Sequence, residues 1–346
     1  MSTHATTTTP RRTGYPGFAG TLKLVGTGPR GSRDLSFDEA RGALTAILRG
    51  EVTPAQAGAF LVATRIKGES PEELAGYAQA LRDAASRLRA ATERPLVACA
   101  GAYDGAAESP HLSLAAGAVA AACGAAIVIH CGPRLGPKYG ITARDVFAAL
   151  GGPPSPSIEQ SEAMLARAGV TVVDSQRAVA GWGEVLEFRN EVGLRGPIHS
   201  AEKLIDYFGA ERFVVGYTHG PYAERLLGAL RVLGARRAIA IRGIEGSDVV
   251  RPGRPVAHDL DGQLERPEHL GETIREPGGV ESSAQLTASI LDCSYRGPER
   301  AAVVLSAAVR MYAAGIVRDP HDGLDLADAA IADGGAQATL RAMFVR

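Results

Sequence analysis

Five short apolar runs in the middle of the chain constrain its fold more than any other feature. They are separated by segments of helical pattern, and they occupy Leu96–Cys99, Ala126–Ile129, Val170–Val173, Phe213–Gly216 and Ala238–Ile241. A strand that is apolar on both faces is typical of a parallel sheet covered by helices on both sides. The pattern therefore predicts an α/β domain with a mostly parallel sheet flanked by helices.

The N-terminal region predicts a smaller domain made only of helices. Three helix starts there carry capping residues, at Ser36–Glu39, Thr53–Gln56 and Ser70–Glu73. Such pairs satisfy the free N–H groups of a helix's first turn. We expect a disordered tail over residues 1–19, a helical domain over 20–90 and the α/β domain over 95–346. A later helical segment near 158–195 is a candidate to join the helical domain.

Composition excludes several classes of protein. The 346 residues carry 37 basic and 38 acidic side chains, for a net charge of -1. This balance excludes a strongly basic, histone-like binder, although a local basic face remains compatible with it. No apolar run approaches the roughly 18 residues that a membrane span needs, so we expect no membrane association. The N-terminus has no apolar segment of the kind a signal peptide contains.

The cysteines point to a reducing compartment. Cys99, Cys123, Cys131 and Cys293 form no CxxC pair and lie in apolar or glycine-rich stretches. We interpret them as small buried hydrophobic residues rather than as metal ligands or a redox pair. A cytoplasmic location is the corresponding expectation.

Loops that follow the strands are the places where ligands bind open α/β sheets. The first such loop contains Asp104 and Gly105 and runs to Ser113, where a helix is expected to begin. Small residues let backbone N–H groups approach an anion, and the helix N-terminus adds favourable partial charge. An ordinary tight turn is the alternative at this position.

The loop after the second strand concentrates positive charge. It contains His130, Gly132, Arg134 and Lys138 together with two prolines. Basic side chains on such a loop, next to the glycine-rich first loop, suit a phosphate or pyrophosphate group. The alternative is a solvated loop whose basic residues face water.

The loop after the fifth strand carries two carboxylates, Glu245 and Asp248, among glycines. Together with waters and substrate oxygens they form a candidate Mg²⁺ site, and a plain Asp/Gly turn is the alternative. His219 follows the fourth strand and is a candidate to line the same cleft. The sequence contains no nucleophile elbow, Walker A loop or nicotinamide fingerprint.

Three longer segments resemble the anthranilate phosphoribosyltransferase family, glycosyltransferase family 3. They are Ala59–Gly76, Asp145–Gly151 and Arg296–Leu305, the last followed by Tyr312–Gly315. The resemblance runs from about residue 20 to the end of the chain. It implies a nucleoside phosphorylase/phosphoribosyltransferase-like fold and a homodimer formed through the N-terminal helices.

The resemblance also implies a reaction. The family moves ribose 5-phosphate from phosphoribosyl pyrophosphate to an aromatic amine. On this chain Ser113 and Lys138 would contact phosphates, Glu245 and Asp248 would hold Mg²⁺, and Arg189 matches the arginine that faces the anthranilate carboxylate. We therefore predict a phosphoribosyltransferase whose acceptor the sequence does not identify.

The ligand loops depart from the family pattern. The family's GTGGDG loop is Ala100–Gly105 here, with the bulky Tyr103 at a glycine position, and its KHGN motif is Ile129–Gly132. These loops are more similar to a divergent branch, some of whose members bind DNA or RNA without sequence preference.

That branch supplies an alternative function. A catalytically inactive homologue would bind nucleic acid through a basic groove contributed by Arg30, Arg33, Arg65, Lys67, Arg134 and Lys138. A pseudoenzyme that binds another phosphorylated small molecule is a third interpretation. We favour the transferase, an interpretation that rests on Asp104, Gly105, Ser113, His130, Lys138, Arg189, Glu245 and Asp248.

Overall fold

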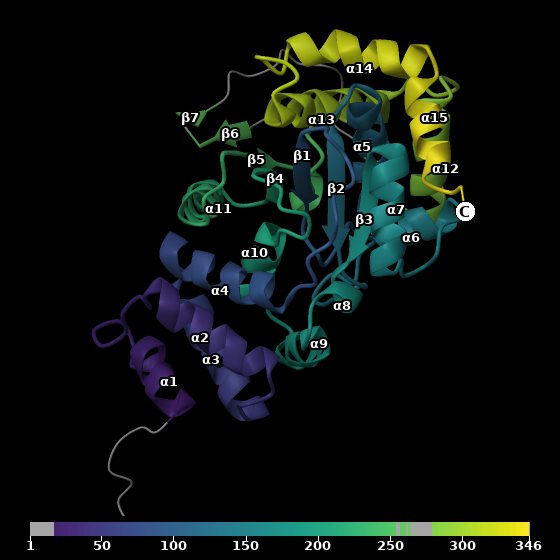
Figure 1. The fold of residues 1–346 in the computed structure, drawn as a ribbon. Coiled ribbons are helices and arrows are strands. Elements are labelled where there is room, and N and C mark those ends of the chain that lie inside the picture. The colour runs from purple at the N-terminus through teal and green to yellow at the C-terminus, as the bar shows by residue number, and fades with distance from the viewer. Residues whose placement is uncertain (1–16, 254–256, 261, 264–278, 346) are drawn as a thin grey trace, which may run out of the picture.

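The computed structural model describes residues 17–253, 257–260, 262–263 and 279–345. A helical domain forms one end of the molecule and the sheet domain forms the other (Figure 1). Residues 1–16 of the expected tail lie outside the described part. In the part of the chain that is described, no helix is long and apolar enough to cross a membrane.

The helical domain begins with four helices. They are α1 (Phe18–Gly26), α2 (Phe37–Leu48), α3 (Pro54–Lys67) and α4 (Pro71–Ala84). The three predicted capping boxes are confirmed, because Ser36, Thr53 and Ser70 each accept a hydrogen bond from the N–H three residues later. Phe18 already lies in α1, so the helical domain begins slightly earlier than expected.

The predicted sheet is confirmed. Its strands are β1 (Leu96–Ala100), β2 (Ala126–Cys131), β3 (Val170–Asp174), β4 (Arg212–Tyr217), β5 (Arg237–Arg242), β6 (Ala257–Asp259) and β7 (Gly262–Gln263). Their order is β3-β2-β1-β4-β5-β6-β7, with β1 to β5 parallel and the last two pairings antiparallel. The carboxyl ends of β1 and β4 therefore lie side by side, which places their loops at a common edge.

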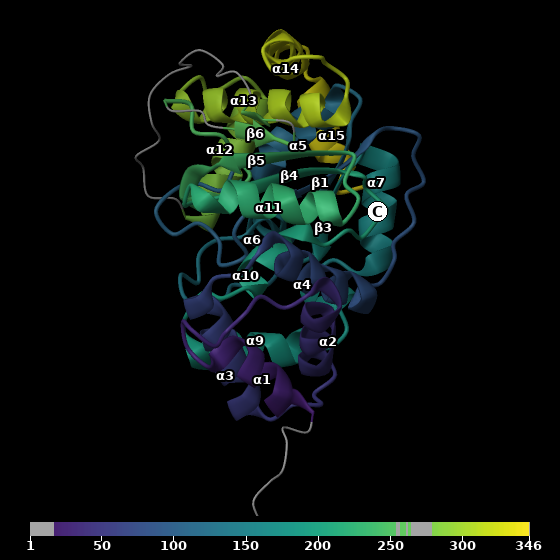
Figure 2. The same cartoon turned by 90° about the vertical axis from the view of Figure 1, so that its left-hand side faces the viewer.

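Successive side chains of a strand point to opposite faces of the sheet, and here each face packs into its own hydrophobic layer. Val97 and Cys99 face a layer of helices that covers one side of the sheet, whereas Ala98 and Ala100 belong to the core shared with α11 and the helical domain. The first layer comprises α5 (Ser113–Ala122), α6 (Ala143–Ala149), α12 (Val280–Leu291), α13 (Pro298–Ala314), α14 (Asp322–Ala332) and α15 (Gly335–Ala342). α11 (Pro221–Val232) crosses the opposite side, as Figure 2 shows.

The segment near 158–195 divides between the two domains. α7 (Ile158–Ala168) packs on β3, while α9 (Trp182–Val192) packs against α2 and α3. Gly181 permits this second contact, because a Cβ at this position would lie 2.0 Å from the carbonyl oxygen of Leu48 and its φ is +75°. Only α9 joins the helical domain.

Short helical turns connect these elements near the domain boundary. They are α8 (Ser175–Ala178), α10 (Ile198–Ala201), η1 (Glu202–Leu204) and η2 (Ile244–Gly246). α4 contacts both α10 and α11, so the helical domain sits below the carboxyl ends of the central strands. This arrangement produces the cleft described next.

Candidate functional site

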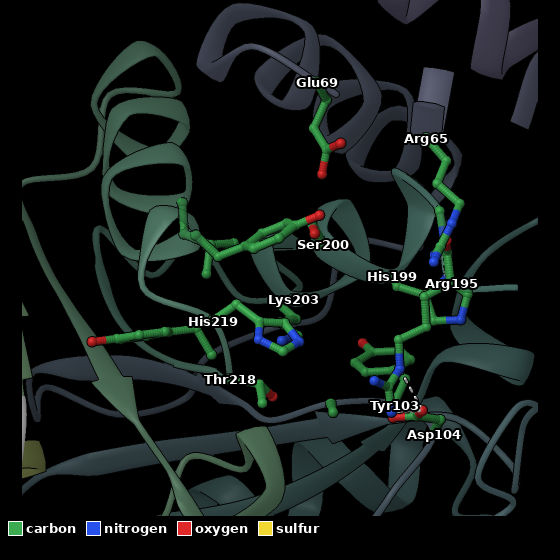
Figure 3. A pocket seen from close by; sticks show the side chains of 15 residues that line it. Arg65, Glu69, Tyr103, Asp104, Arg195, His199, Ser200, Lys203, Thr218 and His219 are labelled. Carbon is green, nitrogen blue, oxygen red and sulfur yellow. Dashed lines mark hydrogen bonds and ion pairs between the residues drawn. The ribbon is translucent and has the colours of Figure 1, made fainter. Parts of the chain in front are cut away.

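A cavity of about 300 Å³ lies between the two domains. The helical domain contributes Arg65 from the last turn of α3 and Glu69 from the loop before α4. The connection that follows α9 contributes Arg195, His199 and Lys203. Figure 3 shows these side chains around a common space.

The sheet supplies the remaining polar side chains of the cavity. Asp104 comes from the loop after β1, and Thr218 and His219 come directly after β4. His219 was expected to line the cleft, and the structure confirms this. Since the carboxyl ends of two neighbouring parallel strands meet here, the cavity has the position at which α/β proteins bind ligands.

Arg65, Arg195 and Lys203 line the cavity together with two acids, Glu69 and Asp104. The guanidinium of Arg195 holds Asp104 through Nε at 2.9 Å and Nη2 at 2.6 Å, so this carboxylate is neutralised. Arg65 donates to the backbone carbonyl of Arg195 and forms no ion pair within the described residues. Arginine's planar fork suits phosphate and carboxylate groups, so the cavity favours an anionic ligand.

Lys203 extends its amine into this space from η1. Its Nζ donates to the carbonyl oxygen of Gly216 at 2.7 Å. Burial lowers the pKa of Lys203 to about 8, and the nearby acids Glu202 and Asp104 only partly oppose this effect. The amine is therefore much closer to losing its proton than an ordinary lysine.

Tyr103 forms one wall of the cavity and fixes His130 behind it. The Tyr103 hydroxyl lies 2.5 Å from Nδ1 of His130, and its ring packs edge-on against Trp182 at 6.2 Å between centroids. Burial lowers the pKa of His130 to about 3 and raises that of Tyr103 well above its usual value. His130 is thus a neutral core residue, separated from the cavity by the phenol.

Gly132 adjoins the same phenol. A Cβ at Gly132 would lie 3.6 Å from Cδ2 of Tyr103 and 3.1 Å from the hydroxyl oxygen of Ser175. Gly105 instead permits a close contact between two loops, because its φ is +76° and a Cβ there would lie 2.5 Å from the carbonyl carbon of Gly140. The two ligand loops predicted from the sequence therefore pack directly on one another.

Lys138 and Glu245 face each other beside these loops. The Glu245 carboxylate accepts hydrogen bonds from the N–H groups of Ala107 at 3.0 Å and Glu108 at 2.9 Å and from the Ser109 hydroxyl at 2.6 Å. Nζ of Lys138 lies 3.3 Å from Oε2 of Glu245. Burial would raise the pKa of Glu245, but these hydrogen bonds and Lys138 lower it.

Ser113 and Asp248 belong to a buried network with Arg310 of α13. Oδ2 of Asp248 accepts from the Ser113 hydroxyl at 2.7 Å and from Nη2 of Arg310 at 2.6 Å. Burial raises the pKa of Asp248, but the charge of Arg310 and the Ser113 hydroxyl bring it below its usual value. All three residues are buried, and none lines the cavity.

The expected Mg²⁺ site is not formed in this arrangement. Asp248 is committed to Arg310, and both oxygens of Glu245 accept hydrogen bonds from the loop after β1. Among the described residues, no three His, Cys, Asp or Glu side chains are grouped as metal ligands would be. Mg²⁺ in proteins is usually bound by one or two carboxylates together with waters and substrate phosphates, and in this arrangement both carboxylates already have protein partners.

Arg189 does not reach the cavity either. It is buried in α9 and pairs with the buried Glu202, so its expected role toward an acceptor carboxylate is not supported by its position. Burial raises the pKa of Glu202 to about 7, although Arg189 acts in the opposite direction. Arg65 is the arginine that the cavity presents instead.

The proposed basic groove is largely neutralised. Arg33 pairs with Glu39, Lys67 with Glu73, Arg134 with Asp145, and Lys138 with Glu245. Of the six basic residues named for nucleic acid, Arg65 instead lines the central cavity. Because four of the six basic residues are paired with acids, the six do not form a continuous basic surface.

Arg195 and Lys203 were missed because the sequence gives them little signal. Both lie in a connection between helices, where basic residues are usually solvated. The one available hint was the glycine-rich segment Gly193–Pro197, which interrupts the helical pattern and ends in a proline.

Comparisons with known proteins agree with this architecture. Residues 22–85 match the helical bundle domain of the glycosyl transferase family, and residues 104–337 match its α/β domain. Anthranilate phosphoribosyltransferase from Anaeromyxobacter sp. (strain K) is 32% identical over 319 residues, which are 89% of this chain and 93% of the relative.

Solved structures show the same fold. The enzyme from Thermus thermophilus has a TM-score of 0.79 at 29% identity, and the match covers 89% of this chain and 94% of that enzyme. The enzyme from Saccharomyces cerevisiae, solved with phosphoribosyl pyrophosphate and Mg, has a TM-score of 0.76 at 18% identity, with coverage of 94% and 97%.

A helical bundle joined to an α/β domain, with a cationic cavity between them, defines the protein as a member of the glycosyl transferase family. Within it, the chain belongs to the anthranilate phosphoribosyltransferase group, whose named members are pentosyltransferases.

Proposed function

We propose that the protein is a phosphoribosyltransferase that binds phosphoribosyl pyrophosphate in the cavity between its domains. The observation that carries this proposal is the convergence of Arg65, Arg195 and Lys203 on one space at the carboxyl ends of β1 and β4. A ligand with several phosphate charges suits such a space. Membership of a pentosyltransferase family supports the same assignment.

Phosphoribosyl transfer requires little covalent catalysis by the protein. The bond between the ribose anomeric carbon and pyrophosphate breaks, and its electron pair leaves with pyrophosphate. A lone pair of the acceptor forms the new bond, and the acceptor then loses a proton. Positioning and electrostatic stabilisation supply the rate. Arg195 and Lys203 would hold the phosphates, and Asp104, oriented by Arg195, would face the electron-poor ribosyl centre.

An aromatic acid is the acceptor that the cavity suits best. Tyr217, Tyr222 and Leu226 provide apolar surface within the lining. Arg65 is the arginine available for an acceptor carboxylate, because Arg189 is already paired with Glu202. The yeast relative was solved in complex with 4-fluoroanthranilate, an acid of this class.

Mg²⁺ is supported as a cofactor of the family by the yeast complex, and no step of this proposal depends on it. The metal in the yeast complex belongs to that protein together with its phosphoribosyl pyrophosphate. A homodimer and a cytoplasmic location remain expectations from the sequence, and sedimentation velocity would measure the first of them.

Calorimetric titration with phosphoribosyl pyrophosphate, with and without Mg²⁺, tests the proposal. We expect saturable binding that weakens at least about tenfold in Arg195→Gln, since a charged hydrogen-bond donor to phosphate is lost. Arg41→Gln is the matched control, because Arg41 forms an exposed ion pair with Asp83 in the helical domain. Anthranilate and related acids are then supplied and pyrophosphate release is measured.

Absence of binding at millimolar ligand would refute the proposal. A gel shift with single-stranded DNA at several salt concentrations addresses the nucleic-acid alternative. Binding of DNA combined with no response to phosphoribosyl pyrophosphate would favour that alternative.

A further inference from the structure

Lysine is rare in this chain, and one of its lysines lies in the central cavity. The sequence contains only Lys23, Lys67, Lys138 and Lys203 among its 37 basic residues. Almost every other cationic position is arginine, which keeps its proton under all ordinary conditions, whereas lysine does not. A lysine at a half-buried cavity position therefore offers a chemical property that arginine lacks.

The surroundings of Lys203 differ from those of the other two half-buried lysines. Lys67 contacts the carboxylate of Glu73 at 2.7 Å, and Lys138 contacts that of Glu245 at 3.3 Å. Nζ of Lys203 instead donates to the carbonyl oxygen of Gly216 at 2.7 Å, and within the described residues it makes no ion pair.

The charged groups around Lys203 act on the protonation of its amine in both directions. Glu202 on its own segment and Asp104 after β1 favour the ammonium, but each is already paired with an arginine. Arg195 and Lys138 disfavour the ammonium, and burial is the largest effect of all. The net result is an amine that spends an appreciable fraction of its time uncharged near neutral pH.

Two arginines line the cavity next to this amine. Arg65 and Arg195 line it, and Thr218 and His219, which come directly after β4, line the same space (Figure 3). A small molecule that carries a phosphate on one end would be held by the arginines, with its other end near the amine. An uncharged lysine amine is a nucleophile toward carbonyl carbon.

We propose that Lys203 is a carbonyl-reactive lysine that condenses with phosphorylated aldehydes or ketones bound in the central cavity. The Nζ lone pair attacks the carbonyl carbon and forms a C–N bond. The resulting carbinolamine loses one molecule of water and gives an imine. This reaction is separate from phosphoribosyl transfer, in which no carbonyl takes part.

Pyridoxal 5′-phosphate is the probe, because it combines an aldehyde with a phosphate. The protein is incubated with the probe at pH 7, sodium borohydride reduces any imine to a stable secondary amine, and peptide mass spectrometry locates the product. We expect modification at Lys203 at least about tenfold faster than at Lys67 or Lys138, because a pKa of about 8 leaves far more free amine than the usual 10.5. Inorganic pyrophosphate should slow this modification.

Three substitutions complete the test. Lys203→Arg keeps the positive charge and should abolish the fast phase, whereas Lys67→Arg and Lys138→Arg should leave it intact. The comparison of rates within the unmodified protein needs no variant, so it stands even where a variant fails to fold. Equal labelling of all lysines, or labelling confined to the exposed Lys23 and the N-terminal amine, would overturn the proposal. Calorimetry with phosphoribosyl pyrophosphate is independent of this outcome, so failure here leaves the proposed function untouched.

Discussion

Nζ of Lys138 lies 3.3 Å from Oε2 of Glu245, and the same carboxylate accepts the N–H groups of Ala107 and Glu108. A lysine, two backbone N–H groups and a serine hydroxyl thus converge on one anion. Such a group of donors also suits a phosphate oxygen. Glu245 holds this position with a backbone φ of +51°, a region that a residue other than glycine seldom adopts.

The first prediction concerns this carboxylate. Glu245→Gln removes the negative charge while keeping the shape of the side chain. We expect affinity for inorganic pyrophosphate, measured by calorimetry without metal, to rise by up to about tenfold, because Lys138 no longer has a competing anion. Glu108→Gln, at an exposed position of the loop after β1, serves as the control. Unchanged affinity in Glu245→Gln would show that Lys138 does not meet the ligand.

The second prediction is a pH dependence of stability that His130 causes. The folded protein holds the pKa of His130 at about 3, whereas the unfolded chain has the ordinary value of 6.5. Below pH 6.5 the unfolded chain takes up the proton first, so the stability supplied by neutral His130 is present above that pH and is lost as pH falls toward 3. Between pH 6.5 and 5 this loss amounts to about 1.5 kcal/mol.

Urea unfolding at these two pH values measures the effect. His130→Gln should show a smaller loss of unfolding free energy on acidification than the parent protein. His321→Gln, at an exposed position, should behave like the parent. Equal pH dependence in all three proteins would contradict the assignment of this effect to His130.

The sequence predicted the architecture well because hydrophobic pattern and helix caps are local. The five apolar runs coincide with β1 to β5, and Ser36, Thr53 and Ser70 begin helices as expected. Near the C-terminus, α14 and α15 are two helices that meet at Gly334, whose φ is +81°. A glycine that ends a helix and a glycine that merely lies within one look alike in sequence.

The site was harder to predict because partners determine what a polar residue does. Asp104 and His219 were placed correctly at the cleft. Asp248 was expected to hold a metal, but it forms an ion pair with Arg310, which lies 62 residues further along the chain. Such long-range pairs leave no trace in the local pattern.

The third prediction follows from that buried pair. Asp248→Asn leaves the guanidinium of Arg310 buried without a counter-charge, so we expect a loss of about 3–5 kcal/mol in unfolding free energy. Asp83→Asn breaks the exposed pair with Arg41 and should cost at most about 1 kcal/mol. Chemical unfolding of the two variants makes the comparison. Similar small losses in both would contradict the buried network and return Asp248 to consideration as a metal ligand.

The last prediction separates two roles of Tyr103. The sequence resemblance places the phenol at a glycine position of the family's loop, so the phenol either supports the core or blocks the ligand. Its side chain is only 1% exposed and packs on His130 and Trp182. Removal of the whole ring in Tyr103→Ala should therefore cost about 3–5 kcal/mol of stability, whereas Tyr103→Phe should cost about 1 kcal/mol for its hydrogen bond. The ring of Tyr103 lines the cavity of about 300 Å³, and Tyr103→Phe keeps this ring. We therefore expect Tyr103→Phe to bind phosphoribosyl pyrophosphate as the parent does. Calorimetry on the stable Phe variant and thermal unfolding of both variants test this. If Tyr103→Ala instead kept full stability and gained affinity, the ring would be an obstruction to the ligand and not a part of the wall.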